Sequence, residues 1–185
     1  MIIVARFHQK VKDGILEITG YDAICPVCNE PMHFHGRCSR FARIETGVKR
    51  IEMSIRVLRC LKCGHFHREL PDFIAPFKHL SLELIAKIYD GTVENPAVDG
   101  SMIIRLRYWV DWLLRYGAVI LKRLKEEHPT FVTKYNAGSL LETLKYFVML
   151  IVNTHEYKLL LRQLNNWLFF LKIRQKNAVA SFPDF

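Results

Sequence analysis

The alternation of hydrophobic and polar residues changes its period part of the way along the chain. Apolar and polar residues alternate strictly over residues 50–57, which predicts a half-buried β-strand. We expect a partner strand over about residues 40–44, with a turn between the two at residues 45–47. Two short apolar groups within residues 1–20 predict two more strands.

In the rear part of the chain the apolar residues recur with the period of an amphipathic helix. Ser81 is suited to cap a short first helix, because its hydroxyl can accept a hydrogen bond from an N–H group of the first turn. A longer helix begins near residue 100, and Gly117 is expected to kink or divide it. Further helices are predicted over residues 139–152 and 156–176, followed by a loose tail.

These patterns predict an α+β protein in two parts. A β-rich domain covers residues 1–75 and an all-helical domain covers residues 76–185, with prolines near the boundary. Within the helical half, residues 76–117 are expected to form a helix-turn-helix-like pair, and residues 118–185 the remaining helices of a bundle. Apolar stripes on these last helices fit either an internal core or the contact of a homodimer.

Two Cys-x-x-Cys pairs lie in the β-rich part. Two residues between cysteines allow both thiolates to reach one ion from a tight turn, and four thiolates form the closed tetrahedral set of a structural zinc site. The pairs are 31 residues apart, and the predicted hairpin explains this gap because its strands run out and back between them. We therefore expect one structural Zn²⁺ bound by Cys25, Cys28, Cys60 and Cys63.

Other readings of these cysteines stay open. Iron could occupy the same cage, or the pairs could be buried or redox-active thiols, although a redox pair normally stands alone at the start of a helix. Cys38 lies between the pairs and is expected to be a free thiol. Four histidines flank the pairs, and one of them could replace a cysteine as ligand: His33, His35, His65 and His67.

The chain is basic, and its charge is uneven. The net formal charge is +9, and the segment from His33 to Arg68 holds nine Lys or Arg and two Glu, so it carries +7 of that total. Such a concentration favours an acidic partner, and DNA is the first expectation, with a plain solvated face as the alternative. The residues predicted to contact nucleic acid are Arg37, Arg40, Arg43, Lys49, Arg50, Arg56, Arg59, Lys62, Arg105 and Arg107.

The sequence also predicts several absences. No signal-peptide pattern and no apolar run long enough to span a membrane is found, so we expect a cytoplasmic protein with no membrane partner. In that reducing compartment paired cysteines are more often metal ligands than disulfides. No general acid–base pair, nucleophile triad or phosphate-binding glycine loop is evident, so we do not expect an enzyme.

The cysteine motifs and the residues after them resemble a known family. The segments Cys25-Pro-x-Cys28 and Arg59-Cys60-x-x-Cys63-Gly64, with the stretch from His67 to His79, are similar to small bacterial proteins of unknown function. The front part of that family looks like the zinc ribbon of insertion-sequence transposases. The resemblance covers roughly residues 20–115.

In that family a helix-turn-helix with a Ser-Thr-Ile-Arg-Arg-like helix start follows the ribbon. The matching stretch here is Ser101–Arg105, in which Met102 and Ile104 depart from the pattern. The resemblance implies a zinc-ribbon DNA-binding protein without its own catalytic domain, which acts as an accessory protein of a mobile element or as a regulator. The alternative is a zinc-ribbon adaptor that binds a protein partner.

Overall fold

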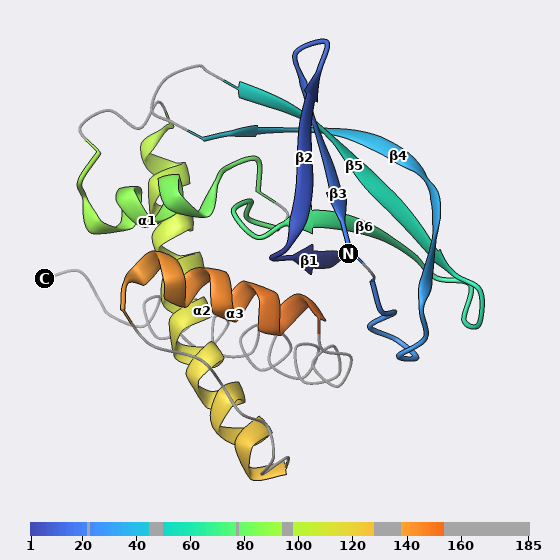
Figure 1. Cartoon of the computed structure of the whole chain (residues 1–185). Helices are drawn as coiled ribbons and strands as arrows, with labels where there is room; N and C mark the ends of the chain where they lie inside the picture. Colours follow the sequence, from blue (N-terminus) through green and yellow to red (C-terminus); the bar gives the residue numbers. More distant parts are fainter. Residues whose placement is uncertain (22, 45–49, 77, 94–97, 128–137, 154–185) are drawn as a thin grey trace, which may run out of the picture. The chain divides into compact units, whose positions relative to one another are not determined.

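The computed structural model describes residues 1–21, 23–44, 50–76, 78–93, 98–127 and 138–153. In this part of the chain, strands come first and helices follow (Figure 1). The strands are β1 (Ile2–Val4), β2 (Phe7–Lys12), β3 (Ile15–Gly20), β4 (Met32–Arg43), β5 (Arg50–Cys60) and β6 (Phe66–Pro71). The helices are α1 (Leu82–Asp90), α2 (Gly100–Glu127) and α3 (Leu140–Asn153).

Strand β5 is the centre of a curled, half-barrel-like sheet. One of its edges pairs with β4 along the whole strand, from Met32 opposite Cys60 to Arg43 opposite Arg50. Its other edge is shared by two strands, because β3 pairs in parallel near Met53 and β6 pairs antiparallel near Leu58. The short β1 continues the sheet in parallel beside β6, and β2 continues it beside β3.

The hairpin predicted between the cysteine pairs is confirmed and is longer than expected. Met53 and Ile55 are buried while Arg50 and Glu52 are exposed, as the alternation along this strand requires. The predicted turn at residues 45–47 lies outside the described residues. Residues 1–20 form three strands and not the two that were predicted. The prediction missed β2 because this strand is polar and exposed and has no hydrophobic alternation.

The helices pack on the sheet through a shared hydrophobic core. One cluster of buried side chains contains Met53 and Leu70 from the sheet, Ile85 from α1, Leu113 from α2 and Phe147 from α3. The predicted cap of the first helix is confirmed, because the Ser81 hydroxyl accepts a hydrogen bond from the N–H of Leu84 at 3.1 Å.

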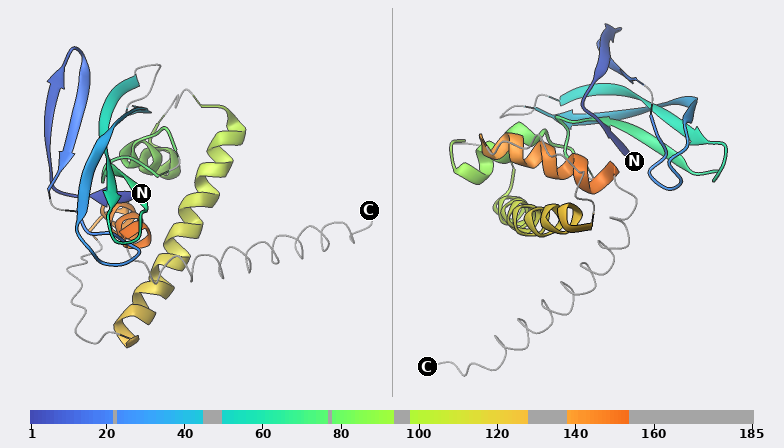
Figure 2. Two further views of the ribbon diagram at one scale, coloured as in Figure 1. Left: turned by 90° about the vertical axis from the view of Figure 1, so that its right-hand side faces the viewer. Right: turned by 60° about the horizontal axis from the view of Figure 1, so that its bottom comes forward.

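Helix α3 also completes the outer edge of the sheet. The N–H of Ile3 in β1 donates to the Asn153 side-chain oxygen at 2.8 Å, and the Asn153 side-chain nitrogen donates to the carbonyl of Ile3 at 2.7 Å. The Asn153 side chain thus pairs with the N–H and the carbonyl of Ile3, two groups that an edge strand would otherwise leave without a partner in the sheet. Figure 2 shows α3 beside β1 from two further directions.

The prediction of an all-helical C-terminal half, with a helix-turn-helix-like pair and a bundle, was wrong. The described part of the chain is a β-rich fold with three helices, and their apolar faces pack against the strands as well as against each other. Helix α2 runs through Gly117 without a break, so no division occurs there. The helix predicted over residues 156–176 lies outside the described residues, and the domain boundary at residue 75 stays a prediction.

None of the helices in the described ranges combines the length and the apolar character needed to cross a membrane.

Strand β6, which the hydrophobic pattern did not reveal, reverses the usual burial of side chains. It buries His67 and Glu69 and exposes Phe66. The Glu69 carboxylate is fully buried and accepts two hydrogen bonds of 2.6 Å from the Arg56 guanidinium, whose side chain is 18% exposed. It also accepts from the N–H of Gly20 at 3.1 Å, while Arg56 donates to the Gly20 carbonyl at 2.7 Å. This network joins β3, β5 and β6.

Replacing Glu69 with Gln should lower the free energy of unfolding by about 3 kcal/mol, because it leaves the largely buried Arg56 charge without its carboxylate. Urea denaturation followed by circular dichroism measures this change. The matched control is Glu83→Gln, which breaks the exposed Lys87–Glu83 pair on α1 and should cost less than about 0.5 kcal/mol. Equal effects of the two substitutions would contradict the role given to Glu69.

Gly117 in α2 packs directly against Phe147 of α3. A Cβ atom at this position would lie 2.5 Å from ring carbons of Phe147, so the aromatic ring occupies the space that a side chain would need. Replacing Gly117 with Ala should destabilise the protein by about 1–2 kcal/mol, since the overpacking outweighs the better helix propensity of alanine. Thermal unfolding measures this. The control Gly100→Ala meets nothing within 4 Å and should be neutral or slightly stabilising.

Candidate metal centre

The two Cys-x-x-Cys segments fold into turns with the same hydrogen bonds. In each turn the carbonyl of the first cysteine accepts from the N–H four residues later: Asn29 to Cys25 at 2.9 Å, and Gly64 to Cys60 at 3.0 Å. Each first cysteine also donates its own N–H to a carbonyl five residues later, at 2.8 Å and 2.9 Å. The two turns are thus equivalent knuckles, one before β4 and one after β5.

Each knuckle closes on a residue with left-handed backbone conformation. The φ angle is 58° at Asn29 and 71° at Gly64. Gly64 has no side chain and adopts this conformation without strain. Asn29 occupies the matching place in the first knuckle, and asparagine is among the non-glycine residues that tolerate this conformation best. The available signal was the shared pattern of Cys-x-x-Cys followed by Gly or Asn.

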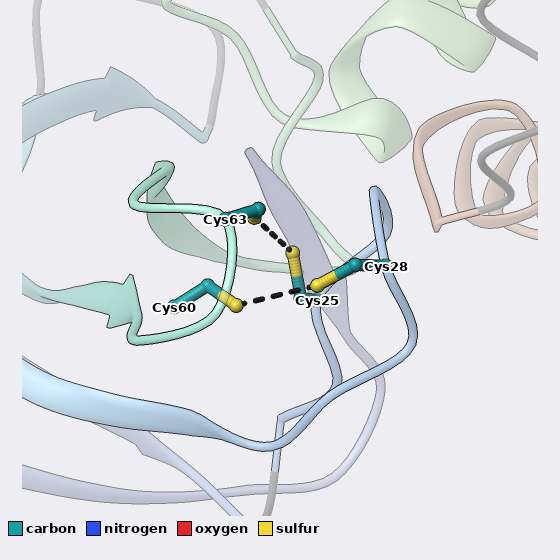
Figure 3. Close-up of side chains that lie close together, drawn as sticks. All are labelled: Cys25, Cys28, Cys60 and Cys63. Carbon is teal, nitrogen blue, oxygen red and sulfur yellow. Dashed lines mark hydrogen bonds between the residues drawn. The ribbon is translucent and has the colours of Figure 1, made fainter.

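The four predicted cysteines come together at one point (Figure 3). Their sulfur atoms all lie within 4.8 Å of one another, with 3.6 Å between Cys25 and Cys63 and 3.4 Å between Cys28 and Cys60. A tetrahedral zinc ion with Zn–S bonds of about 2.3 Å requires sulfur–sulfur distances of about 3.8 Å. Disulfide sulfurs lie about 2.05 Å apart, so these pairs are not disulfides. The cluster could hold one metal ion.

The thiol protons explain why such a cluster suits a cation. A backbone hydrogen bond from Cys63, with help from neighbouring sulfurs, lowers the pKa of Cys60 to about 7. A backbone hydrogen bond from Glu30 acts to lower the pKa of Cys28, but burial and the other three sulfurs raise it to about 12. The crowded site therefore releases one proton readily and resists further negative charge. The positive charge of a divalent ion would stabilise several neighbouring thiolates, and the thiolate is the form that binds metal.

Groups around the sulfurs orient the site. The His67 ring is buried, and its Nε2 lies 4.0 Å from the Cys25 sulfur. The other ring nitrogen, Nδ1, lies 3.0 Å from the nitrogen of the Met1 α-amino group. Lys62 and Glu30 join the two knuckles by an exposed ion pair of 2.6 Å. His67 thus supports a ligand in the way that outer groups commonly do at metal sites.

The remaining candidate ligands are placed elsewhere. His33 and His35 are exposed on β4, and the Nδ1 of His65 lies 3.1 Å from the carbonyl of Cys63. Cys38 lies opposite Ile55 in the middle of the β4–β5 ribbon, outside the sulfur cluster.

Three of the arginines predicted to contact nucleic acid are engaged within the fold. Arg37 donates to Ser54 and to the carbonyl of Ile18, with distances of 2.9 Å. Arg40 donates to the carbonyl of Lys78 at 2.8 Å, and burial, with a contribution from the charge of Arg68, lowers its pKa. Arg56 forms the ion pair with Glu69. Arg37 is exposed despite these bonds, while Arg40 and Arg56 are partly buried. Charge alone could not show which arginines have acceptors within the fold.

Other predicted residues lie at the surface. Arg50, Arg59, Arg105 and Arg107 are exposed, and none of them forms an ion pair with another residue that the structure describes. Lys62 is exposed but paired with Glu30, Arg43 lies opposite Arg50 and is partly buried, and Lys49 lies outside the described residues. The exposed residues of the predicted set that have no ion-pair partner in the described part of the chain therefore include Arg50, Arg59, Arg105 and Arg107.

Comparison with known proteins gives one match. Residues 25–106 match a family described as a domain of unknown function (DUF6431). The match begins at Cys25 and ends in α2, so it spans both knuckles, the β4–β6 strands and α1. The predicted resemblance to a family of unknown function is confirmed to this extent, and the match does not bear on transposases. No curated protein and no solved structure matches the chain.

Replacing Cys60 with Ser should abolish binding of a full equivalent of zinc and lower the free energy of unfolding by more than about 4 kcal/mol, because it removes one of four ligands. Plasma mass spectrometry of the purified protein measures the metal, and urea denaturation the stability. Cys38→Ser is the matched control, since it removes a cysteine outside the cluster and should retain one zinc per chain. Full zinc content in both variants would refute the four-cysteine site.

Proposed function

We propose that this protein is a zinc-ribbon-like DNA-binding module that lacks its own catalytic domain and acts as a transposase-like accessory protein of a mobile element or as a regulatory protein. The main support is the set of exposed arginines on the β4–β5 ribbon that have no acidic partner among the described residues. Arg50 lies at one end of β5 and Arg59 near the other, next to the second knuckle. A ribbon with cations at both ends can contact phosphates along its length.

The surroundings of these arginines favour contact with phosphate. The Arg50 guanidinium lies 5.4 Å from the centre of the Phe41 ring, and His79 stacks on that ring at 4.5 Å. Arg59 lies 5.5 Å from the centre of the Phe66 ring. An arginine that rests on an aromatic ring loses less conformational freedom when it binds an anion.

The metal centre supports this function through the fold. A bound ion would link the knuckles that precede β4 and follow β5, and would hold the ribbon ends in register. Four thiolates leave no open coordination position for a substrate, which favours a structural role over a catalytic one.

The zinc-loaded full chain should bind duplex DNA at low salt, with a logarithmic affinity that falls steeply as salt rises. The double variant Arg50→Gln/Arg59→Gln should weaken binding and reduce the salt slope by about 0.9 for each phosphate that is no longer neutralised. Fluorescence anisotropy over a salt series measures both quantities. Arg105→Gln/Arg107→Gln tests separately whether α2 takes part.

Lys87→Gln is the control, because it removes a positive charge on α1 that is already paired with Glu83. This variant should leave the salt slope unchanged. Absence of binding to both duplex and single-stranded DNA by the zinc-loaded protein at low salt would overturn the proposal and favour the adaptor alternative.

A further inference from the structure

A row of exposed side chains crosses three strands beside the second knuckle. His33 in β4 lies opposite Arg59 in β5, and Arg59 lies opposite Phe66 in β6. His35, at the bulge of β4, has its ring centre 4.8 Å from that of Phe66, and Arg68 lies two residues beyond Phe66. We call these five residues the Phe66 patch.

The Phe66 patch places an aromatic ring in solvent where a strand would normally bury it. Phe66 is 53% exposed, while its neighbour His67 is 3% exposed and Glu69 is fully buried. The reversal follows from the polar groups, because His67 faces the Cys25 sulfur and Glu69 is paired with Arg56. Successive side chains of a strand point to opposite faces, so Phe66 and Arg68 lie on the other face of β6. An exposed aromatic ring whose orientation is fixed by buried polar groups of the same strand is a candidate contact surface for a ligand.

The geometry of the patch suits a planar, anionic ligand. The Arg59 guanidinium lies over the Phe66 ring, and the His35 ring meets it edge-on at 65°. Both aromatic rings and guanidinium planes stack on nucleic-acid bases. The three segments that form the patch, residues 32–36, 57–60 and 66–68, contain two arginines and no Asp or Glu.

We propose that the Phe66 patch is a stacking platform for unpaired bases of single-stranded DNA, with Arg59 and Arg68 contacting the flanking phosphates. This inference rests on the proposed DNA-binding function and names the form of DNA that this face binds. Paired bases in a duplex present only their edges, so a ring on a sheet surface can stack only on bases that are unpaired.

The test compares a fluorescent oligothymidine with a duplex of equal length, using the zinc-loaded full chain and anisotropy. Phe66→Ala should weaken single-strand binding about tenfold or more and change duplex binding less than twofold. Phe66→Leu keeps the apolar bulk and should show the same loss, whereas Phe66→Trp should retain binding. Tyr108→Ala is the matched control, because it removes an exposed ring on α2, 71% exposed, outside the patch.

The outcomes separate the two proposals. Selective loss of single-strand binding in Phe66→Ala and Phe66→Leu, with none in Tyr108→Ala, supports the platform. The platform is refuted, and the DNA-binding function stands, in two cases. In the first, Phe66→Ala and Phe66→Leu bind single-stranded and duplex DNA as tightly as the wild-type protein does. In the second, they lose affinity for the two forms of DNA equally. Binding to neither form overturns both proposals. Should Phe66→Ala fold poorly, Phe66→Leu and Phe66→Trp decide the question.

Discussion

The register between β4 and β5 determines where the metal centre, the buried face of the sheet and the helices can lie. The first knuckle leads directly into β4 and the second directly follows β5, so the four sulfurs meet because Met32 lies opposite Cys60. A slip of one residue would move the knuckles about 3.3 Å apart and turn the side chains of the moved strand to the opposite face of the sheet. Metal geometry, the buried face of the hairpin and the packing of the helices are therefore linked through one set of strand pairs.

Near the candidate metal centre, buried polar interactions contribute to holding the strands together, in addition to hydrophobic packing. The buried residues of β6 include His67, whose Nε2 lies near the Cys25 sulfur, and Glu69, which is paired with Arg56. The glutamate network holds β3, β5 and β6 together. The same arrangement turns Phe66 outward, so the internal chemistry of the strand creates the exposed aromatic surface.

The basic residues divide into two groups with different roles. Arg37, Arg40 and Arg56 donate to backbone or side-chain acceptors within the fold, although Arg37 is itself exposed. Arg50 and Arg59 are exposed beside aromatic rings and have no ion-pair partner among the described residues. The formal charge of the cysteine-containing segment thus overstates the charge available to a partner. A nucleic-acid interface on this protein depends on a small number of oriented arginines, and not on the total.

Features that depend on local spacing could be predicted from the amino-acid sequence. These are the two knuckles, the paired strands between them and the capped helix after Ser81, because two-residue gaps, strict alternation and a capping hydroxyl act over a few residues. Three other features depend on long-range packing. Strand β6 buries charged and polar side chains, and α3 closes the edge of β1. The helices share the hydrophobic core of the sheet and do not form an all-helical half. Those outcomes depend on partners distant in sequence, such as Arg56 for Glu69 and Asn153 for Ile3, and a buried polar group is stable only when such a partner reaches it.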